Sequence, residues 1–352
     1  MTLLLRVTTH QPDPGAIAQA AECLRSGGLV AFPTETVYGL GAHAWDTTAI
    51  RRIFTVKGRP ASDPLIVHIA DATQLATVAA HVSSIATQLA SAFWPGPLTL
   101  VLPRAAGVPA DVTAGGPTVA VRVPAHPVAQ TLLRATGTPV AAPSANLFSR
   151  PSPTCAEHVL QDLKGLIDIV LDGGPTTVGI ESTVLDLSGP MPLVLRPGAI
   201  TLEMLRPLAP NVAYAAPHTR SGALPSPGLL AKHYSPSAPL TLYEGAPAAR
   251  RARMLADTAA LNGEGQLVGI LTSAIDFPAF TKAGAARVVE LGSENHLPSM
   301  AVRLYAALRD VDAPEVTVIL APGIGSPGGL ADALRDRLRR AAAGRIVSVE
   351  GR

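Results

Sequence analysis

Three segments in the first 155 residues place polar side chains next to apolar runs, an arrangement that could bind a small anionic ligand. The first, from Gly28 to Leu40, reads GLVAFPTETVYGL. Its apolar run ends at Pro33 and presents Thr34, Glu35 and Thr36 before the next turn. Polar side chains at the end of a buried strand are well placed to line a cleft. The alternative is an ordinary threonine-rich turn.

The second segment reads KGRPASDPLIVH and places Lys57 and Arg59 at the end of a helical pattern. Two cations held close together by glycine and proline suit a polyphosphate or a carboxylate. The alternative is a pair of cations that stabilises the carboxyl end of a helix. His68, at the end of the following apolar run, is by itself more typical of a strand histidine than of a ligand contact.

The third segment reads PVAAPSANLFSRPSPT and ends at Thr154, where a helical pattern begins. Hydroxyl groups and free backbone N–H groups at the start of a helix bind phosphate oxygens well. The alternative is an ordinary helix cap beside a proline-rich turn.

Two arginines lie on apolar strand patterns further along the chain, Arg122 in VRVP and Arg196 in LRPG. An arginine on a buried strand is costly unless it meets an anion. Each could pair with a carboxylate of the protein itself. Together with Lys57 and Arg59, however, they predict a site for several negative charges.

The elements that position these residues can be predicted from the hydrophobic pattern of residues 1–208. This part mixes strands and helices without a strict alternation, which indicates an α+β or mixed α/β fold around one twisted sheet. The expected strands are 29–32, 65–69, 98–102, 119–123, 169–171, 182–186 and 193–196. The expected helices are 14–26, 47–56, 73–93, 127–136 and 154–163.

The remaining 144 or so residues are expected to form a linker and a second domain, since one core seldom covers a chain of 352 residues. Residues 209–240 are dense in proline and contain no acidic side chain, which predicts an extended, cationic linker. In residues 241–352, strands at 240–243, 267–271, 287–291, 316–320 and 346–349 alternate with helices at 246–262, 293–310 and 329–343. That alternation predicts a small, doubly wound, Rossmann-like parallel sheet.

Composition excludes several classes of protein. The net charge of +2 is too small to predict binding to duplex nucleic acid. Cys23 and Cys155 stand apart, outside any metal-binding spacing or disulfide framework. Residues 72–103 lack charged side chains, but their apolar positions follow a helical period broken by Pro95–Pro97, which favours a surface helix over a membrane span. A soluble, cytoplasmic protein without membrane contact is expected.

Eight segments occur in an order that resembles the YrdC-type threonylcarbamoyl-adenylate synthase family. They are FPTETVYGL, KGRPASDPLIVH, WPGPLTLVL, VAVRVP, APSANLFSRPSPT, DGG, GIESTVLDL and VLRPG. The match covers about residues 10–200, and the linker PSPGLLAKHYSP with the tail resembles the long, two-domain form of this family. The resemblance implies a YrdC-like catalytic domain (1–208), a linker that forms a lid (209–240) and a Rossmann-like C-terminal domain (241–352).

The resemblance also implies roles for individual residues. Those implied to contact L-threonine are Thr34, His68, Arg122, Ala142 and Ser182. Those implied to surround ATP are Arg59, Asp63, Thr118, Ser144, Ser152 and Arg196, with His233 and Tyr234 of the linker closing over the nucleotide. Lys57 and Arg59 are the implied catalytic pair. Asp63 stands where the family commonly has asparagine, and Ser149 where it commonly has glycine.

The implied reaction joins L-threonine, bicarbonate and ATP to give threonylcarbamoyl-AMP and pyrophosphate. It is the first step in forming N6-threonylcarbamoyladenosine at position 37 of tRNAs that read ANN codons. Mg²⁺ is expected on the ATP phosphates, with no protein metal site and no organic cofactor. The product is expected to pass to a tRNA threonylcarbamoyl transferase complex, with tRNA contact indirect or weak.

Three alternative functions compete with this one. Residues 323–328 read GIGSPG, and Glu350 follows at the distance typical of a dinucleotide site, although the motif falls in the last βαβ unit. An RNA-binding module without turnover is the main alternative, which the aromatic content of 4% disfavours. A larger carbamoyl-transferring relative would carry zinc-type cysteine motifs, and this sequence has none.

Overall fold

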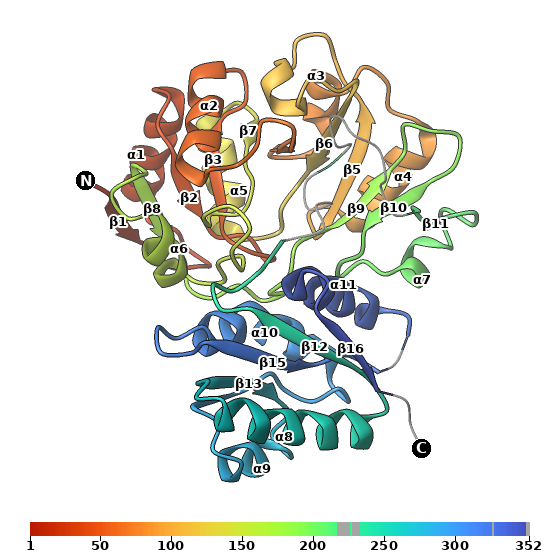
Figure 1. Ribbon diagram of the computed structural model, residues 1–352. Helices are drawn as coiled ribbons and strands as arrows, with labels where there is room; N and C mark the ends of the chain where they lie inside the picture. Colours follow the sequence, from red (N-terminus) through yellow and green to blue (C-terminus); the bar gives the residue numbers. More distant parts are fainter. Residues whose placement is uncertain (217–225, 227–232, 326, 350–352) are drawn as a thin grey trace. The chain divides into compact units, whose positions relative to one another are not determined.

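The computed structural model describes residues 1–216, 226, 233–325 and 327–349 and is shown in Figure 1. The chain divides into two compact units. The first contains Met1–Phe148 and Ser152–Leu229, and the second contains Ser149–Pro151 and Leu230–Arg352. Most of the central part of the predicted linker (217–225 and 227–232), Ser326 of the glycine-rich loop and Glu350 lie outside the described residues.

The first unit is built on an eleven-stranded mixed sheet with the strand order β1-β8-β2-β3-β7-β4-β6-β5-β9-β10-β11. This agrees with the predicted mixed α/β class. The strands are β1 (Leu3–Arg6), β2 (Val30–Phe32), β3 (Gly39–His43), β4 (Ile66–His68), β5 (Leu98–Pro103), β6 (Thr118–Arg122), β7 (Val140–Ala141), β8 (Ile169–Asp172), β9 (Thr183–Asp186), β10 (Leu193–Arg196) and β11 (Ala213–Tyr214).

Helices pack against both faces of this sheet, which explains why its strands read as continuous apolar runs. Successive residues around β2 belong to two different cores: Leu29 and Ala31 to one, Val30 and Phe32 to the other. The helices of this unit are α1 (Pro14–Arg25), α2 (Thr47–Lys57), α3 (Leu75–Val78), α4 (Ser84–Phe93), α5 (Pro127–Thr136), α6 (Ala156–Leu163) and α7 (Leu202–Leu205), with short 3₁₀ helices at Ala72–Gln74 and Ala110–Thr113.

The predicted long helix over 73–93 was wrong. The chain forms α3, leaves the helical conformation at Ala79 and starts again as α4. Ala79 pairs with Arg104 in an isolated antiparallel bridge, and the Ala80 N–H donates to the Pro103 carbonyl at 2.9 Å. Ser83 then caps α4 by accepting from the Ala86 N–H. Tertiary pairing with the end of β5 therefore outweighs the helical period, which contains no glycine or proline to mark the break.

The second unit is a five-stranded parallel sheet with the order β14-β13-β15-β12-β16. Helices α8 and α9 cover one face, and α10 and α11 cover the other (Figure 1). This confirms the predicted doubly wound sheet. The elements are β12 (Leu240–Gly245), α8 (Pro247–Gly263), β13 (Val268–Thr272), α9 (Phe277–Lys282), β14 (Arg287–Glu290), α10 (Leu297–Val311), β15 (Val318–Pro322), α11 (Leu330–Ala342) and β16 (Ile346–Val349).

Within the part of the chain that the structure describes, none of the helices is long and apolar enough to cross a membrane.

Candidate active site

Arg122 lies at the end of β6 and is the centre of a buried polar cluster in the first unit. Its Nη2 donates to Glu35 at 2.7 Å, its Nη1 to the Thr36 hydroxyl at 2.9 Å and its Nε to the Gly96 carbonyl at 3.2 Å. The second Glu35 oxygen accepts from the Ala125 N–H at 2.9 Å. These contacts hold the guanidinium in one orientation. They also use only three of its five N–H donors among the described residues, so two remain for a ligand.

The loop after β2 is ordered by Thr34 as well as by Glu35. The Thr34 hydroxyl lies 2.8 Å from the Thr36 hydroxyl and donates to the Val37 carbonyl at 2.6 Å. The Thr36 hydroxyl also accepts from Arg122, so Thr34 and Arg122 are connected through Thr36 by two hydrogen bonds. The first sequence segment therefore lies beside Arg122.

A pocket of about 1080 Å³ opens beside Glu35 and is also lined by His10, Ala125 and His126. Burial lowers the pKa of His126, as does His10 more weakly, whereas Glu35 acts in the opposite direction. The pocket therefore borders the Arg122 cluster through Glu35. The lowered pKa of His126 favours the neutral form of its imidazole on this side of the pocket.

A second cluster surrounds Asp63, whose side chain is fully buried. Its Oδ2 lies 2.9 Å from Nη2 of Arg59, which also donates to the Pro64 carbonyl at 2.8 Å. Burial raises the pKa of Asp63, while Arg59, Lys57 and Arg196 oppose that rise. Three of the four predicted cations are thus close enough to one carboxylate to affect its ionisation.

Lys57 is buried and fixes the third sequence segment. Its Nζ donates to the Ser144 carbonyl at 2.6 Å and to the Asn146 carbonyl. The Lys57 carbonyl in turn accepts from the Phe148 N–H at 2.8 Å. Lys57 therefore joins the end of α2 to the loop containing Ser144, so two of the three predicted segments meet here.

Arg196, at the end of β10, contacts Ser182. Its Nε and Nη2 donate to the Ser182 carbonyl at 3.1 and 3.0 Å, and Nη2 also lies 3.2 Å from the Ser182 hydroxyl. That hydroxyl lies 2.7 Å from the Thr99 hydroxyl on β5. The arrangement links the predicted threonine-binding Ser182 to the predicted ATP-binding Arg196.

The other predicted residues occupy varied positions. Ser152 is buried and donates to Glu181 at 2.5 Å. The Ala142 N–H donates to the Ile66 carbonyl at 2.9 Å beside β4. Thr118 begins β6 and is half-buried. His233 and Tyr234 belong to the second unit, where the Tyr234 ring packs 5.3 Å from that of Tyr305.

His68 lies at the end of β4 in a setting that keeps its ring neutral. Burial, and to a smaller degree Arg122, lowers its pKa from 6.5 to about 3. Its ring lies edge-on to Phe32, with centroids 6.2 Å apart. A neutral imidazole can both donate and accept a hydrogen bond, so His68 suits a polar ligand group better than an additional positive charge.

The sequence analysis named Glu35 among the polar residues of the first segment but gave it no role, and it gave none to Glu181 or Thr99. The signal for Glu35 was present, since it stands between two threonines at a strand end. Nothing in the sequence pairs Glu35 with Arg122, which is 87 residues away. Ser149 has a φ of 66°, in the left-handed region that favours glycine, the residue that the family resemblance implies at this position.

The described residues contain no group of three histidine, cysteine or acidic side chains that could hold a metal ion. The buried carboxylates Asp63 and Glu35 are each engaged with an arginine. This donor set does not fit a dedicated protein metal site.

Comparisons with known proteins agree over the whole chain. A family profile described as telomere recombination matches residues 22–198, and one described as threonylcarbamoyl-AMP synthase, C-terminal domain, matches residues 200–343. The threonylcarbamoyl-AMP synthase of Pyrococcus abyssi is 42% identical over 99% of this chain and 100% of its own length. That of Bacillus subtilis is 44% identical over 97% of this chain and 96% of its own length.

Solved structures give the same result for the fold. A structure of Pyrococcus abyssi Sua5 matches with a TM-score of 0.93 over 100% of this chain and 99% of that one. A second structure, of the same protein complexed with L-threonine, matches with a TM-score of 0.91 over 99% of both chains at 42% identity. Full-length identity of this order, with both domain profiles in sequence, means that the chain belongs to the threonylcarbamoyl-AMP synthase family.

Proposed function

We propose that this protein makes threonylcarbamoyl-AMP and pyrophosphate from L-threonine, bicarbonate and ATP, as the first step of N6-threonylcarbamoyladenosine formation in tRNA. The observation that carries the proposal is the burial of four cations in the first unit: Arg122 in one polar cluster, and Lys57, Arg59 and Arg196 around Asp63 in another. Four buried cations next to only a few carboxylates form an environment suited to an anionic ligand. Relatives that match nearly the full chain carry the corresponding name.

The first chemical step joins the two small substrates. The threonine amine attacks the carbon of CO2, or of bicarbonate with loss of water, and a C–N bond forms while the amine loses a proton. Arg122 binds the threonine carboxylate with its two remaining N–H donors, since a guanidinium fork matches a carboxylate. Thr34, His68, Ser182 and the backbone near Ala142 complete the threonine site. Neutral His68 contributes hydrogen bonding without competing for the carboxylate.

In the second step an oxygen of the N-carboxylate attacks the α-phosphorus of ATP, and the bond to the pyrophosphate oxygen breaks. No protein nucleophile takes part, so the residues act by positioning and charge stabilisation. Arg59 and Arg196 stabilise the phosphate oxygens, with Thr118, Ser144 and Ser152 around the nucleotide. Asp63 holds Arg59 in place through their ion pair. Lys57 acts through the Ser144 loop that it fixes.

Mg²⁺ is proposed to enter with ATP. Because the described residues offer no three-ligand metal group, the phosphates and water would supply most of its coordination. When bound, the ion would neutralise part of the triphosphate charge. No organic cofactor is required.

The product is a mixed anhydride of a carbamic acid and a phosphate, which water hydrolyses readily. We therefore propose transfer to a tRNA threonylcarbamoyl transferase complex in the cytoplasm, with weak or indirect contact to tRNA. The role of residues 209–240, including His233 and Tyr234, as a lid over the nucleotide stays a prediction.

Carbon-labelled bicarbonate tests the proposal. The purified chain with ATP and L-threonine should place the label in a conjugate whose mass is that of threonine, carbon dioxide and AMP combined, minus one water. Arg196→Ala should abolish the conjugate, while Arg51→Ala should retain it, since Arg51 is an exposed side chain that pairs with Asp111 at the surface. Absence of label from any adenylate, together with salt-dependent tRNA binding, would favour the RNA-binding alternative.

A further inference from the structure

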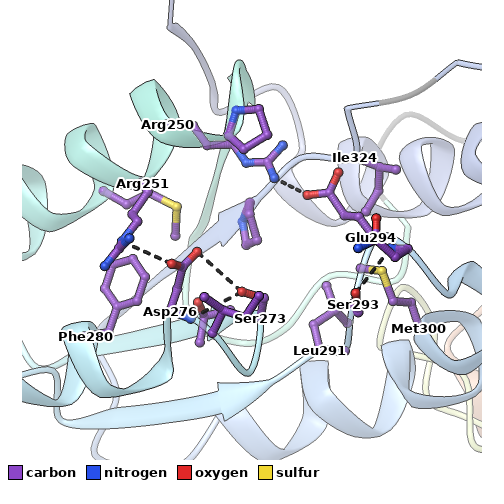
Figure 2. Close-up of a pocket in the computed structure, with 17 residues that line it drawn as sticks. Arg250, Arg251, Ser273, Asp276, Phe280, Leu291, Ser293, Glu294, Met300 and Ile324 are labelled. Atoms are coloured by element: carbon purple, nitrogen blue, oxygen red, sulfur yellow. Dashed lines mark hydrogen bonds and ion pairs between the residues drawn. The ribbon is translucent and has the colours of Figure 1, made fainter.

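The second unit contains a pocket that the proposed reaction does not use. It has a volume of about 340 Å³, at the lower end of the range for small-molecule sites. Its lining comes from segments that follow β12, β13, β14 and β15, so it lies outside the carboxyl ends of four parallel strands (Figure 2).

The topology of the sheet explains why a pocket forms there. The helix that follows β15 is α11, on one face, whereas α8 and α9, which follow the neighbouring strands β12 and β13, cover the opposite face. The connections therefore diverge on the two sides of β15. Such a switch point is where open α/β sheets bind ligands.

Two ion pairs reach across the pocket from α8. Arg250 contacts Glu294, which follows β14, and Arg251 contacts Asp276, which follows β13, at 3.1 Å (Figure 2). The Arg250 side chain is only 7% exposed, yet its Nη1 has no hydrogen-bond partner among the described residues. A buried guanidinium donor left without an acceptor is costly, so an acceptor on a ligand bound beside Arg250 would remove that cost.

The rest of the lining combines apolar side chains with hydroxyl groups. Met254, Phe280, Leu291 and Met300 supply apolar surface, and Ser273 and Ser293 lie beside the two acidic residues. The Ser273 hydroxyl donates to Asp276 at 3.4 Å. The pocket thus combines an apolar wall with two positive and two negative groups.

The charge pattern selects the chemistry of the occupant. A ligand with only negative charge would meet Asp276 and Glu294, and a ligand with only positive charge would meet both arginines. A phosphate at the glycine-rich loop after β15 is also disfavoured. The Gly325 N–H already donates to Glu294 at 3.1 Å and the Gly328 N–H to Asp332 at 3.0 Å, so carboxylates occupy the positions of an anion.

We propose that this pocket binds a free α-amino acid with an apolar side chain. The ligand carboxylate accepts from Nη1 of Arg250, its ammonium group donates to Glu294 or Asp276, and its side chain packs on Met254, Phe280, Leu291 and Met300. The site is separate from that proposed for threonine, because all its residues belong to the second unit. It also gives Gly325 a role, because its N–H supports Glu294 rather than a dinucleotide phosphate.

Isothermal titration calorimetry on the full chain tests this assignment with leucine, methionine and phenylalanine at up to millimolar concentration. At least one should bind saturably. Arg250→Gln should weaken that binding about tenfold or more, the loss expected for a buried hydrogen bond to a charged group. Arg253→Gln is the matched control, because Arg253 lies on the same helix and pairs with Asp257 outside the pocket. It should leave binding unchanged.

Analogues of the ligand that binds test the requirement for both charges, for example isopentylamine and 4-methylpentanoate in place of leucine. Each should bind more weakly than the amino acid. If Arg250→Gln does not fold, Glu294→Gln and these analogues decide the question with the folded proteins. Binding of the deaminated acid as tightly as the amino acid, binding of AMP but of no amino acid, or no binding of any of the three would overturn the proposal.

Discussion

Arg122 shows how a buried charge can be both structural and ready for a ligand. Glu35 neutralises it, Thr36 and Gly96 fix its plane, and two N–H donors are left without partners among the described residues. A lysine could keep the charge at this position. It could not reproduce three contacts in fixed directions, because an ammonium group lacks the planar fork.

Arg122→Lys is therefore expected to raise the KM for L-threonine by about tenfold or more while the KM for ATP changes little. Steady-state kinetics with each substrate varied in turn would separate the two constants. Arg51→Lys is the control, since Arg51 is exposed and pairs with Asp111. Equal increases in both KM values would show that Arg122 has no specific role with threonine.

His68 gives the protein a predictable response to acid. Its pKa is lowered to about 3 in the folded chain, chiefly by burial, against 6.5 for an ordinary histidine. Between these values the unfolded chain binds more protons than the folded chain, so the free energy of unfolding falls as the pH falls. The contribution of His68 is complete above about pH 6.5 and is lost progressively toward pH 3.

His68→Gln should therefore show a shallower loss of unfolding free energy between about pH 6.5 and pH 4 than the unchanged chain. Urea denaturation followed by circular dichroism at several pH values measures this slope. Identical slopes for the two proteins would mean that His68 is not buried as a neutral ring.

Which residues form the site could be predicted from sequence better than what each one contacts. Arg122 and Arg196 were identifiable because arginine is unusual at the ends of apolar strands, and Arg59 because it stands beside Lys57 and a glycine at the end of a helical pattern. The partners of these arginines could not be identified from the sequence. Only the folded chain brings Asp63, Glu35 and Ser182 into contact with them. Lys57 illustrates the limit: its sequence position suggested phosphate binding, whereas its ammonium group reaches two backbone carbonyls.

At the scale of elements, α2 is the helix that places two of the site cations. Asp46 caps its first turn by accepting from the Thr48 and Ala49 N–H groups. Gly58 ends it at φ 63°, and Lys57 and Arg59 lie on either side of this glycine. The left-handed conformation turns the chain so that the two cations point to different partners.

Gly58→Ala should lower the free energy of unfolding by about 1 kcal/mol, because an alanine in the left-handed region is strained. It should also raise the KM for ATP, since the strain falls between Lys57 and Arg59. Gly137→Ala is the matched control: Gly137 ends α5 at φ 74°, and, as at Gly58, an added Cβ would meet nothing within 4 Å. An equal change in KM from both variants would contradict the role of the α2 terminus.

Element types were predictable where the apolar period was strong and its ends were marked. The helix at 127–136 and the strands at 193–196 and 346–349 have the predicted bounds. Short elements were missed, including β3, whose GLGAH sequence looks like a turn, and α9. The sequence of the predicted helix at 73–93 carried no mark of the bridge to Arg104 that interrupts it.

At the scale of the whole molecule, each of the two units contains a candidate site. The first holds the four buried cations, and the second is a doubly wound sheet with a pocket of its own. His233 and Tyr234, which the family resemblance assigns to nucleotide binding, are buried in the second unit, with their ring centroids 4.0 Å apart. Their predicted role therefore links the stability of the second unit to ATP binding.

His233→Ala is expected to raise the KM for ATP several-fold with only a modest loss of stability. Phe280→Leu provides the comparison. Phe280 is buried in the core of the second unit around β13, a core that does not include His233 or Tyr234. It should lower the melting temperature without changing the KM for ATP. The lid prediction is wrong if, in both variants, the KM for ATP rises only in proportion to the loss of melting temperature.

Pyrophosphate release from ATP tests the central claim most directly. The full chain with Mg²⁺ should release pyrophosphate only when both L-threonine and bicarbonate are present, and Arg59→Ala and Arg196→Ala should abolish that release. Release that does not depend on threonine, or no release from the folded chain with all three substrates, would contradict the assignment of the buried cations of the first unit as a threonylcarbamoyl-AMP synthase site.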